Sequence, residues 1–122
     1  QPADRFVLRG TVPGAMDSTK VTLRPADRWD RELATAYVVG GKFELCGKLD
    51  APTLCKLSLD NVDYIRRSGQ SQELMRCYEL DFFAGNGRLA FTTPHIDSLP
   101  QAYGLYDIRK EGERLCRPRC LL

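Results

Sequence analysis

The most reactive side chains of this 122-residue chain are its cysteines, Cys46, Cys55, Cys77, Cys116 and Cys120. No two of them have the Cys-x-x-Cys spacing of redox dithiols and zinc sites, because Cys116 and Cys120 are separated by three residues. The single histidine, His95, argues against a mixed Cys/His metal cluster. We therefore expect no redox centre, no metal site and no cofactor.

An odd number of cysteines means that at least one thiol is free or is paired with another chain. The alternation of side chains places Cys46 and Cys77 on the polar faces of two strands and Cys55 in the core. A disulfide between Cys46 and Cys77 is one alternative. Unpaired, unreactive thiols are the other.

Acid–base chemistry would need a histidine or paired carboxylates near a nucleophile. His95 follows Pro94, which places it in a turn, and no nucleophile is close in the sequence, so we interpret it as a loop histidine without a catalytic role. The carboxylates that fall near strands belong to the solvent-facing positions by alternation; they are Asp60, Asp63, Glu79 and Asp81. These features predict that the chain is not an enzyme.

Two short motifs resemble ligand loops only loosely. The run of residues 60–63 lacks the glycine and the terminal glutamate of a helix-loop-helix calcium site. Gly85-Asn86-Gly87 joins two predicted strands, whereas a phosphate-binding loop leads into a helix. We interpret both as structural turns.

Aromatic residues in the connections are the remaining candidates for ligand contact. Trp29, Tyr64 and Tyr103 lie between predicted strands, where they would form a platform for a glycan or a peptide. The alternative is that they cap the hydrophobic core, which is common for Tyr and Trp in such positions.

Composition and charge narrow the class of protein. Hydrophobic residues make up 43% and charged residues 28%, and 18 Lys+Arg against 16 Asp+Glu leave no concentrated basic face for nucleic acid. No apolar run approaches the ~20 residues that span a bilayer. The chain opens with Gln1-Pro2 and no methionine, so we expect an exported product whose leader is absent, with any lipid anchor upstream.

Short apolar strands recur about every ten residues between Gly, Pro and Asn turns, at residues 6–12, 20–24, 35–39, 42–49, 54–60, 74–83 and 88–92. This rhythm predicts an all-β fold, an antiparallel β-sandwich or partly open barrel of about seven strands. We expect a hairpin at Gly40-Gly41, a mobile polar excursion at 61–73, and a short helix near the C-terminus capped by Asp97 or Ser98. Residues 1–108 would form the domain, and residues 109–122 a basic, poorly ordered tail.

The run 35–52 and the strand and turn at 82–89 resemble a family of domains of unknown function. Members are β modules at the N-termini of envelope proteins of anaerobic Gram-negative gut bacteria, often ahead of a thioredoxin- or peroxiredoxin-like domain. The resemblance covers residues 6–107 and implies a place in the cell envelope, in the periplasm or anchored at the outer membrane. It assigns no functional residues. The chain lacks the thioredoxin-like domain, and residues 113–122 depart from the family pattern, which suggests a frameshifted or truncated end.

These observations predict a non-catalytic accessory or interaction domain of a cell-envelope protein, related to modules that accompany thiol–disulfide oxidoreductases. The alternative is a stand-alone envelope module that binds glycan or peptide through loop aromatics. The expected partners are an envelope thiol–disulfide protein or a cell-surface glycan. Exposed strand edges also favour a homodimer.

Overall fold

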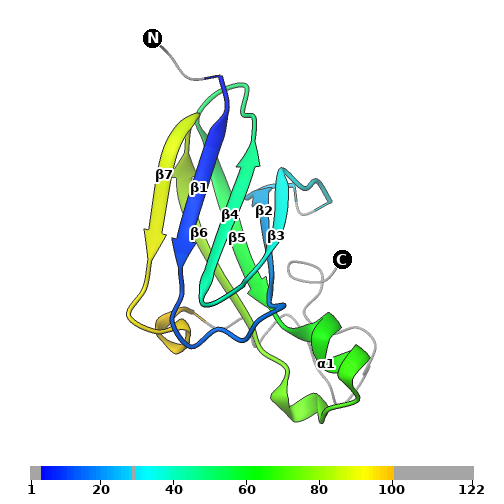
Figure 1. Cartoon of the computed structure of the whole chain (residues 1–122). Helices are drawn as coiled ribbons and strands as arrows, with labels where there is room; N and C mark the ends of the chain where they lie inside the picture. Colours follow the sequence, from blue (N-terminus) through cyan, green and yellow to red (C-terminus); the bar gives the residue numbers. More distant parts are fainter. Residues whose placement is uncertain (1–3, 29, 101–122) are drawn as a thin grey trace.

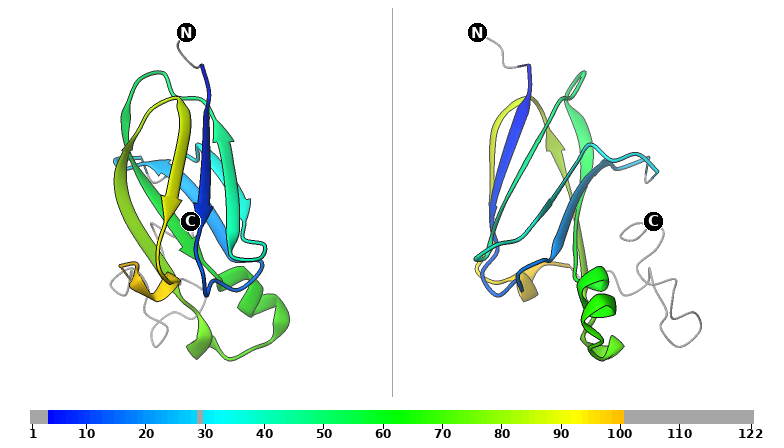
Figure 2. Two further views of the ribbon diagram at one scale, coloured as in Figure 1. Left: turned by 60° about the vertical axis from the view of Figure 1, so that its left-hand side comes forward. Right: turned by 45° about the vertical axis from the view of Figure 1, so that its right-hand side comes forward.

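Two β-sheets packed face to face make up the protein (Figures 1 and 2). The structure is a computed structural model and describes residues 4–28 and 30–100. Sheet A has the strand order β4 (Lys42–Gly47), β1 (Phe6–Thr11) and β7 (Gly87–Thr92). Sheet B has the order β3 (Ala34–Tyr37), β2 (Lys20–Pro25), β5 (Thr53–Asp60) and β6 (Cys77–Ala84). The predicted all-β sandwich with seven strands is confirmed.

One strand pair departs from the antiparallel pattern that we predicted. β7 runs parallel to β1, whereas β1–β4 and all pairs of sheet B are antiparallel. The cause is that the turn after β6 carries the chain across to sheet A, where Gly87 N–H donates to Arg5 O over 2.7 Å. β7 therefore starts at the same end as β1 and must run in the same direction.

The core of sheet A is organised by two reciprocal glycine–phenylalanine pairs. Gly10 lies opposite Phe43 and Gly47 lies opposite Phe6, on either side of the pair formed by two leucines. A Cβ atom added at Gly10 would lie 2.1 Å from the Phe43 ring, and one at Gly47 would lie 2.7 Å from the Phe6 ring. Each glycine therefore provides the space into which the opposite ring packs.

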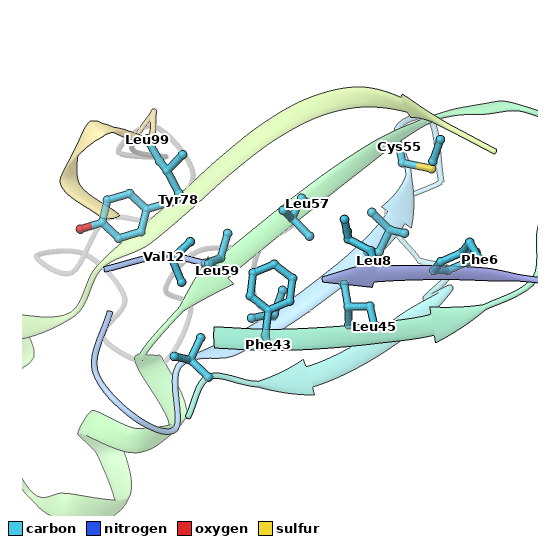
Figure 3. Close-up of a cluster of buried hydrophobic side chains, with 14 of the residues drawn as sticks. Phe6, Leu8, Val12, Phe43, Leu45, Cys55, Leu57, Leu59, Tyr78 and Leu99 are labelled. Carbon is cyan, nitrogen blue, oxygen red and sulfur yellow. The ribbon is translucent and has the colours of Figure 1, made fainter. Parts of the chain in front are cut away.

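The interior between the sheets is continuous (Figure 3). Leu8 and Leu45 of sheet A pack in one cluster with Leu57 and Leu59 of sheet B. Tyr78 lies toward one end of this cluster, near the segment that follows β7. Burial of this apolar surface, at about 25 cal/mol per Å2, is what holds the two sheets together.

The tight turn at Gly40-Gly41 forms as predicted, but the strands that flank it separate. Both glycines have positive φ, and Val39 and Lys42 exchange two backbone hydrogen bonds of 2.9 and 3.1 Å. Beyond this single bridge, β3 pairs with β2 and β4 pairs with β1. The predicted long hairpin is therefore wrong, because each strand finds a better partner in its own sheet.

The turn from β6 to β7 is fastened to the segment after β4. The Asn86 side-chain amide donates to Leu49 O over 2.8 Å and accepts from Leu49 N–H over 3.0 Å. This pair of bonds satisfies the backbone of a buried residue, Leu49. Asn86 thus ties two connections that lie far apart in the sequence.

The polar segment that we predicted as a mobile excursion contains a helix, α1 (Val62–Ser68), and a 3-10 turn, η1 (Gln72–Leu74). Val62 and Ile65 are fully buried, and Gly69 ends the helix in a left-handed conformation. The prediction was wrong because a helix of seven residues, about two turns, is too short for a recognisable period. No helix in residues 4–28 and 30–100 is long and apolar enough to cross a membrane.

A 3-10 turn, η2 (Ile96–Ser98), follows β7 and lies at the same end of the sandwich as α1 (Figure 1). His95 caps it, and Leu99 is already extended. The predicted helix with Asp97 or Ser98 as its cap is therefore wrong over residues 97–100. The rest of that segment lies outside the described residues.

Candidate functional site

A cavity of about 230 Å3 lies at the end of the sandwich that carries α1 and η2. Its wall is built from the loop between β1 and β2, the junction of β5 and α1, the start of β6, and η2. Small-molecule sites usually measure about 300–1,000 Å3. The cavity therefore matches one large side chain or one sugar ring better than a cofactor.

One wall of the cavity is a hydrogen-bonded set of Tyr78, Asp97 and His95. The Tyr78 hydroxyl donates to Asp97 Oδ1 over 2.8 Å, and Asp97 N–H donates to His95 Nδ1 over 3.1 Å. Since Nδ1 accepts this bond, the neutral imidazole carries its proton on Nε2. The second Asp97 oxygen lies 3.6 Å from His95 Nδ1.

Gly14 provides the space for this imidazole. It has a φ of +89°, and a Cβ atom at this position would lie 2.1 Å from His95 Nε2. The Pro13 carbonyl next to it accepts a hydrogen bond of 2.8 Å from Ile96 N–H. The turn at Pro13-Gly14 thus also holds η2 and His95 in place.

Asn61 braces the opposite wall. Its side chain donates to Leu74 O over 3.0 Å and accepts from Arg76 N–H over 2.7 Å. The Arg76 guanidinium in turn donates through Nη1 to Glu73 O and Met75 O, over 2.7 and 2.8 Å. In the segment 60–63, which resembles a calcium loop only weakly, the Asn61 amide therefore serves to hold backbone groups of the cavity wall. No metal-binding cluster occurs among the described residues.

Asp60 also lines the cavity, and the structure corrects its predicted exposure. Its relative accessibility is 2%, and Oδ1 accepts a 3.0 Å hydrogen bond from Val62 N–H. Burial, opposed by that hydrogen bond, raises the pKa of Asp60 to about 7. Asp81 is exposed as predicted, whereas Asp63 and Glu79 are half-buried.

Each polar side chain of the cavity wall already holds a hydrogen bond, including Thr19, whose hydroxyl donates to Met16 O over 2.6 Å. His95 is held by a backbone N–H at Nδ1, and no serine, cysteine or lysine lines the described wall. A nucleophile next to a base is the usual signature of covalent catalysis.

The three predicted ligand-contact aromatics are not brought together in this cavity. Tyr64 is half-buried on α1 and is not part of the cavity wall. Trp29 and Tyr103 lie outside the described residues. Sequence reasoning missed Tyr78, Asn61 and Arg76, because their types are common in ordinary structural positions; the only signal was the position of Asn61 directly after a strongly apolar strand.

The cysteines follow neither alternative completely. Cys46 is exposed and free, and Cys55 is buried and free, with its pKa raised by burial. Cys77 is buried and disulfide-bonded. The predicted Cys46–Cys77 bond is therefore wrong, since Cys46 lies on the outer face of sheet A and Cys77 begins an edge strand of sheet B.

Three comparisons place the chain among known proteins. A family model described as "Domain of unknown function (DUF4369)" matches residues 6–108, and the chain belongs to this family. No match was found among curated proteins. Among solved structures, the chain is similar to a 5-hydroxyisourate hydrolase of Klebsiella pneumoniae, with 12% identity over 73% of this chain and 86% of that chain and a TM-score of 0.46. So distant a likeness has no bearing on function.

Proposed function

We propose that this member of the DUF4369 family is a non-catalytic interaction domain of a cell-envelope protein. Its partner would be a thiol–disulfide protein, as the family resemblance implies, and the cavity would receive one side chain of that partner. The observation that supports this proposal is the cavity wall, in which the ionisable groups are engaged with one another and with the backbone.

The shape and chemistry of the cavity fit a single anchoring side chain. Its volume is about 230 Å3, and Leu74 and Ile96 give it apolar contact area beside the polar groups of His95 and Asp97. Interfaces commonly depend on one or two such anchors that fill a pocket, surrounded by contacts of little individual effect. The outer edge of β7, which pairs with no other described strand, is where a second copy of the chain would pair in the same proposal.

The proposal is tested by titrating the isotope-labelled chain with a purified thioredoxin-like domain from a Gram-negative gut anaerobe, followed by NMR. Saturable shifts at Tyr78, His95 and Asp97 are expected. Leu74→Arg, at the mouth of the cavity, should weaken binding about tenfold or more, which is about 1.4 kcal/mol. Leu54→Arg is the matched control, because Leu54 is similarly exposed but is not part of the cavity wall.

Two results would overturn the proposal. One is the absence of any saturable shift, or equal weakening by Leu74→Arg and Leu54→Arg. The other is turnover by the chain alone, measured as insulin reduction in the presence of a thiol or as hydrolysis of p-nitrophenyl acetate. Either kind of turnover would show catalysis by a domain that the proposal describes as non-catalytic.

A further inference from the structure

An exposed aromatic side chain, Tyr37, lies between two open hollows on the flank of the sandwich. One hollow, of about 520 Å3, is lined by Tyr37 together with Ser18, Asp63, Arg66 and Arg67. The other, of about 470 Å3, is lined by Tyr37 and by the neighbouring parts of β1 and β4, with Arg9, Lys42 and Glu44. Each volume falls in the range of ligand sites.

Tyr37 is exposed because of its position in β3. Ala34 and Ala36 pack against the core, so Thr35 and Tyr37 take the outer positions of this strand. The relative accessibility of Tyr37 is 50%, and its register partner in β2 is Lys20. An exposed ring with cations beside it provides a flat surface and fixed positive charge together.

The charge around Tyr37 is predominantly positive. The two hollows contain the cations Arg9, Lys42, Arg66 and Arg67, against the carboxylates Glu44 and Asp63. Glu44 is held by Arg9, with a distance of 3.4 Å between Arg9 Nε and Glu44 Oε1. The near-neutral charge of the whole chain therefore conceals a local excess of positive charge beside an exposed ring.

The backbone on this flank is held in place. Ser18 has a φ of +73°, and its N–H donates to Val38 O over 3.0 Å, one residue beyond Tyr37. Asp17 Oδ1 accepts from Gly40 N–H over 2.9 Å. The loop before β2 is thus fastened to the turn that directly follows Tyr37, so that a ligand would meet a preformed surface.

We propose that the surface around Tyr37 binds an acidic oligosaccharide, with a sugar ring stacked on Tyr37 and its carboxylates or sulfates paired with Arg67 and Lys42. A glycan is favoured over an acidic peptide because every side chain that lines the first hollow beside the Tyr37 ring carries a hydrogen-bonding group, as the hydroxyl groups of a sugar require. This site is separate from the cavity at the end of the sandwich and does not depend on the thiol–disulfide partner proposed above.

The test uses tetragalacturonate as the probe and isothermal titration calorimetry with the full chain. Tyr37→Ala is expected to weaken binding about tenfold, the usual effect of losing one aromatic contact. Phe83→Ala is the matched control, because Phe83 is a strongly exposed aromatic residue of β6 outside both hollows. Arg67→Gln should weaken binding several-fold, and Arg88→Gln, on the exposed face of β7, should not.

A neutral glycan and an acidic peptide are used as probes to distinguish an acidic glycan from these two other classes of ligand. Maltotetraose should bind at least about tenfold more weakly than tetragalacturonate, and added salt should weaken tetragalacturonate binding because exposed charges are screened within about 10 Å at 0.1 M. Tighter binding of tetraglutamate would replace the glycan with an acidic peptide and contradict the proposal. So would equal losses for Tyr37→Ala and Phe83→Ala, or no binding of tetragalacturonate.

Discussion

Sheets A and B have similar inner faces and very different outer faces. On sheet A, the side chains that point away from the core, such as Arg9, Glu44 and Cys46, are exposed. On sheet B, the corresponding positions include Thr22, Arg24 and Ser58, whose relative accessibilities are 1%, 5% and 1%. Polar residues at alternate positions therefore meet solvent on sheet A but are buried on β2 and β5, the two central strands of sheet B.

The difference shows what an alternating pattern does and does not specify. It identifies which side chains share a face, because successive residues of a strand point in opposite directions. It does not say whether the polar face meets water. On sheet B the charged side chains are accommodated by pairing, as in Lys56 with Asp81 at 2.6 Å and Arg24 with Glu32 at 3.5 Å.

The largest expected effect concerns the buried carboxyl of sheet B. The pKa of Asp60 is raised from 3.8 to about 7, so the folded state holds this proton more tightly than the unfolded chain does. The contribution of Asp60 to the free energy of unfolding is full below about pH 4 and is lost as the pH rises through about 7. Asp60→Asn removes this loss. Between pH 4.5 and pH 8, the free energy of unfolding of wild type should fall by on the order of 3 kcal/mol relative to that of the variant.

Urea denaturation of both proteins at the two pH values measures this difference. Asp81→Asn is the control, because Asp81 is a carboxylate of the same sheet that is exposed to solvent. If wild type and Asp60→Asn showed the same change in stability between the two pH values, ionisation of the buried Asp60 carboxyl would not destabilise the folded protein.

The glycine–phenylalanine pairs of sheet A should give the next largest effect. Gly10→Ala places a methyl group within 2.2 Å of two atoms of the buried Phe43 ring, and overpacking of this kind costs about 2–3 kcal/mol. Gly85→Ala should be neutral within about 0.5 kcal/mol, since nothing lies within 4 Å of its Cβ position and its φ is not positive. Thermal denaturation compares the two, and equal melting temperatures would contradict the packing described for sheet A.

The link between connections at the far end of the sandwich is expected to contribute less. Asn86→Ala removes both side-chain hydrogen bonds to Leu49 and should cost about 1–2 kcal/mol, because the backbone of a buried residue loses its partners. Amide hydrogen exchange provides the specific readout. The Leu49 amide should exchange faster in the variant, while amides in the middle of β5 keep their protection.

The smallest effect should come from the ion pair on the outer face of sheet B. Asp81→Asn is expected to change stability by at most about 1 kcal/mol, since the Asp81 side chain is 47% exposed and such pairs contribute little in water, while Lys56 keeps its second partner Glu79 at 4.0 Å. The change should shrink further as salt is added. A cost several times larger would mean that this face excludes water as completely at Asp81 as it does at Ser58.

The sequence predicted the class of fold because that class depends on features that are local in the chain. Alternation in β1 and β4 and the turn at Gly40-Gly41 each require only neighbouring residues. The parallel pairing of β1 with β7 was not predicted, because it depends on which sheet a strand joins after a turn. α1 was missed for a related reason, since only Val62 and Ile65 on it are buried.

The candidate site was predicted less well than the fold. His95 was placed correctly in a turn. The cavity, however, forms where four segments that are separate in the sequence come together. Asn61, Tyr78 and Gly14 contribute to it only because of this tertiary contact. Asp60 was assigned to solvent by the alternation of its strand, which does not say whether a polar position meets water. Tyr37 was not singled out, since its exposure depends on β3 lying at the edge of sheet B.

The position of β1 between β4 and β7 has a consequence for how the protein is made. Sheet A joins the first of the described strands to the last of them, so a ribosome must release residues up to Thr92 before these three strands can pair. Contacts of such long sequence separation slow folding to about milliseconds to seconds in domains of this kind. Until then β1 presents an unsatisfied edge along its whole length, and this is the interval in which a nascent chain would most need shielding from its neighbours.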